Sequence, residues 1–103
     1  EIVDNFRVGC QGIIPATDCA DKFVKIYYHV LKKDFDKANK KYQEILPAIV
    51  FIMQSINTLV CYGKRVYAYR MGIKSIYDRK PSLSPTDYGI KKSKEIAKIL
   101  GKF

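Results

Sequence analysis

Few residues of this 103-residue chain combine the type and spacing that catalysis or metal binding needs. The only histidine, His29, lies between Tyr28 and Val30 with no second ligand at turn or helical spacing, whereas a metal site uses several His, Cys or carboxylate ligands. The chain has no Gly-x-Ser-x-Gly nucleophile motif and no phosphate-binding loop. We therefore predict a structural histidine and no metal site.

The carboxylates do not form a catalytic pair either. Asp18 lies near Asp21, and Asp34 lies near Asp36, but hydrolysis requires two carboxylates that face each other across a cleft. Short acidic pairs of this kind are typical of helix starts, where they accept free backbone N–H groups. We expect capping roles for them.

The charge is unevenly distributed. Residues 1–63 hold eight Lys or Arg against seven Asp or Glu, whereas residues 64–103 hold eleven against three, a net +8. Residues 62–70 also interleave basic and aromatic side chains, as a nucleic-acid surface would. Solvated helix faces explain the same charge, and a buried stripe with a basic outer face explains the same spacing. For the charge we prefer solvated helix faces, whereas the two interpretations of the spacing explain it equally well. We expect no nucleic-acid partner.

Cysteine usage and hydropathy indicate the class of protein. Cys10, Cys19 and Cys61 match neither a disulfide framework nor a Cys-x-x-Cys metal site, so we predict reduced packing residues in a cytoplasmic protein. The longest apolar stretch, residues 45–62, is interrupted by polar residues and by Pro47. It falls short of the roughly 18 uninterrupted apolar residues of a membrane span, and we expect no membrane partner.

Helical periodicity dominates the first two thirds of the chain. We predict a helix over residues 19–32, capped by Thr17 or Asp18, with an apolar stripe that includes Leu31. Asp34 is a plausible N-cap for the next helix. Pro47 should kink that helix or start a new one, because proline lacks an N–H group. Residues 48–60 are apolar nearly all round, which is typical of a helix buried on several sides or at a subunit contact.

The remaining residues predict two more helices. Residues 62–65 should break or bend the apolar segment, and a helix over residues 66–71 should end at Gly72. Ser84 resembles the N-cap of a last helix that runs to about Leu100, with Ile99 on its inward face, and ends at Gly101.

One segment differs from this helical pattern. Residues 9–16, with the sequence GCQGIIPA, have the glycine and proline boundaries and the β-branched residues of a short buried strand. Two successive isoleucines suit a parallel sheet that is covered on both faces. The rest of the chain contains no convincing partner strand, so the sheet must be completed from elsewhere.

The order of these features resembles the C-terminal third of the dihydrodipicolinate synthase and N-acetylneuraminate lyase family. The resemblance covers nearly the whole chain and depends on order and spacing more than on one motif. It departs from the family at residues 18–21, where Asn-x-x-Pro is usual, and at Asn57, which no proline follows. The stretches that carry it are GCQGIIPA, Asp21-Lys22-Phe23, Lys33-Asp34-Phe35-Asp36-Lys37-Ala38, Leu46-Pro47, residues 51–54, Lys64-Arg65, Met71-Gly72-Ile73 and Arg79-Lys80-Pro81.

The resemblance implies an α/β fold: the C-terminal portion of a TIM (β/α)8 barrel, with no complete barrel in this chain. Residues 9–33 would be the last barrel strand and helix, and residues 34–103 a C-terminal helical layer, so the chain taken alone should be mostly α-helical. Family members act on pyruvate or other 2-oxo acids through a lysine Schiff base, without a metal or organic cofactor. The Schiff-base lysine and the proton-relay tyrosine belong to earlier strands, so we expect no catalytic residue here.

For the site, the resemblance implies that the backbone around Ile14 borders the bound 2-oxo acid, and that Gly12 permits close approach of the chain. None of the fifteen lysines matches the Schiff-base position, and Lys64-Arg65 matches a position with a structural role. We expect the parent to be a homo-oligomer, a tetramer or dimer, and this chain alone to be inactive. The alternative is a basic helical nucleic-acid-binding or interaction module.

Overall fold

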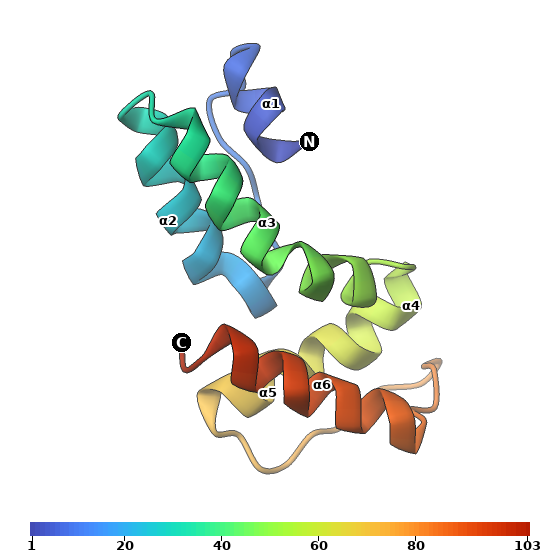
Figure 1. Cartoon of the computed structure of the whole chain (residues 1–103). Coiled ribbons are helices and arrows are strands. Elements are labelled where there is room, and N and C mark those ends of the chain that lie inside the picture. The colour runs from blue at the N-terminus through green and yellow to red at the C-terminus, as the bar shows by residue number, and fades with distance from the viewer. The chain divides into compact units, whose positions relative to one another are not determined.

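A computed structural model describes all 103 residues, and every regular element in it is a helix (Figure 1). The chain divides into two compact units, Glu1–Pro47 and Ala48–Phe103. The prediction of a mostly helical chain is confirmed. The sequence-based division into residues 9–33 and 34–103 describes places in a barrel, and it stays a prediction.

The first unit contains three short helical elements and the beginning of a long helix. These are α1 (Ile2–Arg7), the 3-10 turn η1 (Thr17–Cys19), α2 (Ala20–Leu31) and the first part of α3 (Phe35–Ile52). The sequence did not predict α1, which buries Val3 and Phe6; the ring of Phe6 lies 5.4 Å from the ring of Tyr27 on α2.

A tight turn at residues 32–34 joins α2 to α3, and a connection this short makes the two helices antiparallel neighbours. Lys33 adopts a left-handed φ of 57° in this turn. The predicted N-cap is confirmed: the N–H group of Lys37 donates to Oδ1 of Asp34 at 3.2 Å. Hydrogen bonds from Lys37 to the Asp34 carboxylate lower its pKa. Ile26 of α2 and Ala38 of α3 are fully buried.

The second unit begins with the last turn of α3 and continues through a second helical run. That run comprises α4 (Ile56–Thr58), a π-helical segment η2 (Leu59–Gly63) and α5 (Lys64–Met71). After a connection over residues 72–86, α6 (Asp87–Leu100) packs against α5 and against η2. Gly72 ends α5 with a left-handed φ of 72°, and Gly101 ends α6, as the sequence predicts.

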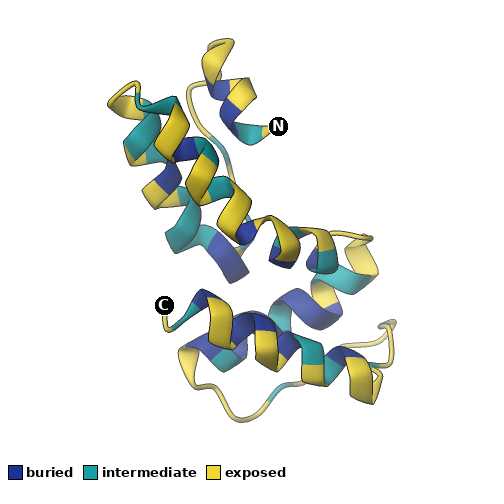
Figure 2. Ribbon diagram, in the orientation of Figure 1, coloured by how far each residue is buried: buried dark blue, intermediate teal, exposed yellow.

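The core of the second unit is formed where α6 meets η2 and α5 (Figure 2). Gly89 allows α6 to approach closely, because a Cβ atom there would lie 2.3–2.5 Å from ring atoms of Tyr62. The N–H group of Thr86 donates to the Tyr62 hydroxyl at 3.2 Å, and the Tyr62 ring packs 5.4 Å from that of Phe51. The fully or nearly fully buried apolar side chains here are Ile52, Cys61, Val66, Ala68, Ile96 and Leu100.

Several local predictions are wrong. The segment at residues 9–16 forms no strand, because an extended segment without a partner strand has no ladder of hydrogen bonds. No side chain caps α2, although Thr17 or Asp18 was expected to; the 3-10 turn η1 precedes that helix instead. The cap of α6 is Thr86, two residues after the predicted Ser84.

The helix boundaries in the middle of the chain also differ from expectation. Helix α3 continues through Pro47 rather than restarting there, since proline removes only one N–H donor. The interruption comes at residues 53–55, where Ser55 and Thr58 form a capping box that starts α4. At residues 62–65, where a break or bend was expected, the chain does not leave the helix, but the π-helical η2 gives way to the α-helical α5 after Gly63.

Exposure corrects two inward assignments. Leu31 and Ile99, predicted to face inward, have 59% and 76% of their surface exposed. Residues 48–60, predicted to be buried on several sides or at a subunit contact, bury Ala48 and Ile52 but expose Val50, Met53 and Ile56. No single helix is both long enough and apolar enough to cross a membrane. One bent pair of helices, residues 35–52 with residues 56–71, has the required length and composition when the two are taken together.

Candidate functional site

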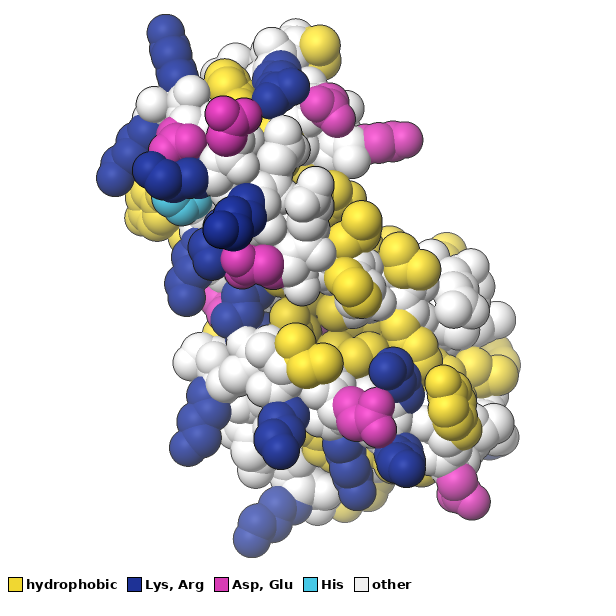
Figure 3. Space-filling model, viewed as in Figure 1, with side chains coloured by type: hydrophobic (Ala, Val, Ile, Leu, Met, Phe, Trp, Pro, Cys, Tyr) yellow, Lys and Arg dark blue, Asp and Glu magenta, His cyan; other side chains and the backbone are white.

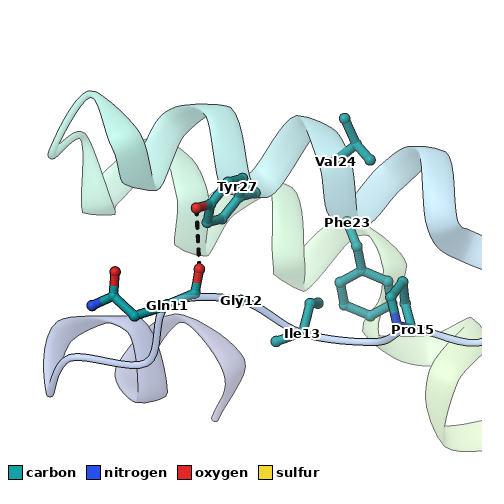
Figure 4. A pocket seen from close by; sticks show the side chains of 7 residues that line it. All are labelled: Gln11, Gly12, Ile13, Pro15, Phe23, Val24 and Tyr27. Atoms are coloured by element: carbon teal, nitrogen blue, oxygen red, sulfur yellow. Dashed lines mark hydrogen bonds between the residues drawn. The ribbon is translucent and has the colours of Figure 1, made fainter.

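The candidate site is built on residues 9–16, which connect α1 to η1 (Figure 4). Gly9 makes the turn out of α1 with a φ of 107°, a value that L side chains rarely adopt. The side chain of Gln11 donates to the carbonyl of Gly9 at 3.0 Å. From there the backbone runs without regular structure to Ala16, which is extended at φ −66° and ψ 151°.

This segment lies along α2, in the direction opposite to the helix. The hydroxyl of Tyr27 donates to the carbonyl of Gln11 at 3.1 Å, near the C-terminal part of α2. One helical turn earlier, the Phe23 side chain lies beside Pro15 (Figure 4). An extended segment followed by a helix that runs back along it is the arrangement of a βα unit.

The side chains of the segment alternate between two sides. Ile13 and Pro15 are partly buried and help to line the pocket against α2. Ile14, between them, does not line the pocket and is as accessible as in an extended peptide, at 102%. A period of two residues is that of a β-strand, so one face of the segment is covered by α2 and the other is open.

A pocket of about 290 Å³ lies between the segment and α2. Its apolar lining comes from Ile13, Pro15, Phe23 and Val24, and its polar groups are the Gln11 side chain and the Tyr27 hydroxyl, already engaged in hydrogen bonds. The lining contains no lysine, histidine or carboxylate. The pocket can therefore hold apolar groups, and Tyr27 is its one side chain of a type that transfers protons, with its hydroxyl engaged by the carbonyl of Gln11.

The predicted substrate-binding residues, Gly12 and Ile14, lie in this segment, and Gly12 also borders the pocket. A Cβ atom at Gly12 would meet nothing within 4 Å, so packing inside the chain does not require glycine there. Ile14 does not line the pocket. The sequence did not assign the helix side of the site, Phe23 and Tyr27, because their spacing on α2 is also that of ordinary core residues.

A second cluster of polar residues centres on Asp78 in the 72–86 connection. Nη1 and Nη2 of Arg65 both donate to the Asp78 carboxylate. Nζ of Lys64 donates to Oδ1 of Asp78 at 3.0 Å and to the carbonyl of Tyr77 at 2.6 Å. The hydrogen bond from Arg65 lowers the pKa of Asp78 to about 2. Lys64 and Arg65 thus tie the connection to the start of α5.

Cys61 lies against the same arginine. Nη1 of Arg65 donates to the carbonyl of Cys61 at 2.7 Å, and burial raises the pKa of the Cys61 thiol. A buried neutral thiol is a poor nucleophile. All three cysteines are free; Cys19 and Cys61 are buried, as predicted for packing residues, whereas Cys10 is exposed.

The titratable residues do not assemble into a metal site. No group of three or more His, Cys, Asp or Glu side chains lies close enough to hold a metal ion. His29 is half-buried on α2, beside the turn that Asp34 caps. The sequence could not identify the Asp78 cluster, because thirteen residues separate Arg65 from its partner and Asp78 appeared isolated.

No family model, curated protein or solved structure matches the chain. The resemblance to the dihydrodipicolinate synthase and N-acetylneuraminate lyase family therefore depends on the quoted residues and their order alone.

Proposed function

We propose that this chain is the C-terminal portion of a Schiff-base lyase or aldolase that acts on 2-oxo acids. The observation that carries the proposal is the alternation along residues 13–15: Ile13 and Pro15 line the pocket against α2, and Ile14 between them is fully exposed. A barrel strand has these two faces, one toward its helix and one toward the barrel interior. The order of the family-like motifs along the chain adds support.

In this proposal the chain contributes the wall of a substrate site and not its nucleophile. The open side of the segment at Ile14 would lie at the barrel mouth, where Ile14 contributes its backbone. Gly12, which has no side chain, would leave room for a 2-oxo acid. Pocket residues on the α2 side would fix the position of the strand. A short, rigid wall beside the reacting carbonyl favours one orientation of the substrate.

The chemistry would use a lysine outside this chain. Its neutral amine attacks the ketone carbon of the 2-oxo acid, and loss of water gives an iminium ion. In dehydration, a base removes the C3 proton to form an enamine, which expels the protonated C4 hydroxyl as water and leaves an iminium that water hydrolyses. In aldol cleavage, a base removes the proton of the C4 hydroxyl, the C3–C4 bond breaks to release an aldehyde, and its electron pair forms an enamine with the iminium carbon. Protonation of the enamine and addition of water then release the product and the lysine amine.

The experiment that tests the proposal begins with the reading frame upstream of Glu1, which should continue for roughly 200 residues to supply the rest of a barrel. The full-length protein is then mixed with pyruvate and borohydride, which reduces the iminium to a stable amine. Peptide mass spectrometry should find the adduct on a lysine upstream of residue 1, and the isolated 103-residue chain should form none.

Two results would overturn the proposal: an adduct on one of the fifteen lysines of this chain, or a full-length protein that forms no adduct with any 2-oxo acid tested. Because borohydride reduces the lysine–pyruvate iminium to a stable amine, an added mass on a lysine that requires both pyruvate and borohydride reports the Schiff base. In the full-length protein, Gly12→Val should raise KM for the 2-oxo acid. Val24→Ala, in the pocket wall, is the control and should raise KM less.

We also propose that the parent protein is a homo-oligomer that uses residues 48–60. Val50, Met53, Ile56 and Val60 are 49–79% exposed, and exposed apolar side chains grouped in one segment mark interaction surfaces. Light scattering on the full-length protein should give a dimer or tetramer. Ile56→Asp should lower the measured mass toward that of a monomer. An unchanged mass would contradict a subunit contact through residues 48–60.

A further inference from the structure

A groove in the second unit is lined by basic residues. It has a volume of about 650 Å³ and lies between the end of α5, the residues that follow it, and the C-terminal half of α6. Its lining includes the cations Arg70, Lys74, Lys94, Lys98 and Lys102, together with the ring of Tyr69. No carboxylate lines it.

The acids of the second unit are used elsewhere. Asp78 pairs with Lys64 and Arg65, Glu95 pairs with Lys92, and Asp87 lies in the first turn of α6. None of the four groove lysines forms an ion pair with a carboxylate. Lys and Arg side chains outnumber acids over α6 in the space-filling view (Figure 3).

One wall of the groove is held in place by Arg70, which is buried. Its Nε donates to the carbonyl of Gly101 at 2.7 Å, and its guanidinium lies 4.7 Å from the centre of the Phe103 ring. On the facing side, Nζ of Lys94 lies 5.8 Å from the centre of the Tyr69 ring. Arg70 therefore fixes one wall of the groove, and the Lys94 amino group packs against an aromatic ring of the same groove.

The uncompensated charge favours an anion. The carboxyl end of α6 supplies roughly half a negative charge, which offsets only a small part of four lysines. Like charges that surround a concave surface repel one another and focus a positive potential into it, and a bound anion relieves this repulsion. Several lysines at one site suit a ligand with several negative charges more than a single carboxylate.

We propose that this groove binds a small polyphosphate anion, such as an inorganic or nucleoside polyphosphate. The volume lies within the range of small-molecule sites, roughly 300–1,000 Å³, and the groove receives Lys74 from the connection after α5 as well as Lys94 and Lys98 from α6. A phosphate chain offers several charges at close spacing, and lysine is a common phosphate ligand. The inference does not depend on the proposed lyase function.

The test is titration calorimetry of the 103-residue chain with inorganic tripolyphosphate at 150 mM salt. We expect saturable binding with one site per chain. The double variant Lys94→Gln/Lys98→Gln should weaken binding at least tenfold, because it removes two of the four lysine charges of the groove. The control Lys80→Gln/Lys91→Gln removes the same charge from outside the groove and should change the affinity less than twofold. Circular dichroism checks that both variants fold.

Three outcomes would overturn the proposal. The first is no saturable binding of tripolyphosphate. The second is an equal loss in both double variants, which would indicate a diffuse effect of net charge. The third is that a single-stranded 20-nucleotide DNA binds more tightly than tripolyphosphate, with a steep salt dependence, and that both double variants weaken this binding equally. That result would indicate a nucleic-acid surface instead.

Discussion

Replacement of Asp78 by asparagine tests how much the ion pairs of this carboxylate with Arg65 and Lys64 stabilise the second unit. The carboxylate receives hydrogen bonds from Arg65 and Lys64, and its pKa falls from an ordinary 3.8 to about 2. At about 1.36 kcal/mol per pKa unit, this difference corresponds to at most about 2.4 kcal/mol of stability at neutral pH. Because the side chain is 20% exposed, screening by solvent reduces the expected value to about 1–2 kcal/mol.

The sign of the pH dependence follows from the direction of the shift. An acid whose pKa is lower in the folded state than in the unfolded state stabilises the fold fully above the unfolded value, near 4. The stabilisation is lost as the pH falls through the folded value, near 2. The difference in unfolding free energy between the native chain and Asp78→Asn should therefore narrow by about 1–2 kcal/mol between pH 7 and pH 2.

The assay is urea unfolding followed by circular dichroism across this pH range, with hydrogen exchange on peptides from α5 and α6 to assign the change to the second unit. Asp87→Asn is the control, because it removes an acid of the same unit that makes no ion pair. A difference that stays constant from pH 7 to pH 2 would refute the reasoning. So would equal effects of the two substitutions.

Two further predictions use pairs of matched positions. Gly89→Ala should destabilise the fold by about 1–3 kcal/mol, because the new Cβ collides with the buried side chain of Tyr62. At Gly12 a new Cβ meets nothing within 4 Å, so Gly12→Ala should leave the free energy of unfolding unchanged. Equal melting temperatures for the two variants would contradict the packing of α6. Thr86→Ala should lower the free energy of unfolding by about 1 kcal/mol, because the Thr86 hydroxyl accepts a hydrogen bond from the N–H group of Gly89 at 3.1 Å. Ser84→Ala should change the free energy of unfolding by less than about 0.5 kcal/mol. The reverse order in thermal unfolding would show that Ser84 is the cap.

Local patterns predicted most of the helices. The cap at Asp34 and the helix ends at Gly72 and Gly101 each depend on one residue and its near neighbours, and all three are confirmed. Errors arose where two nearby residues could serve the same purpose, as with Ser84 and Thr86, or where a helix tolerated an unfavourable residue, as α3 tolerates Pro47.

The candidate site was only half predictable. The sequence singled out residues 9–16 because glycine, proline and isoleucine restrict the backbone in recognisable ways. It could not show which side of the segment α2 covers, since Phe23 and Tyr27 have the spacing of any amphipathic helix. The basic groove was predictable only as a net charge of +8 without a location.

By itself, the sequence determined the helical class, the positions where helices end and the basic character of the last forty residues, because these follow from local backbone preference and composition. Only the tertiary structure decided which charges are neutralised. Arg65 finds Asp78 thirteen residues away, and Gly89 finds Tyr62 twenty-seven residues away, through the packing of α6 and the connection before it. Such pairings depend on distances in space, so four lysines are left without a carboxylate around one groove.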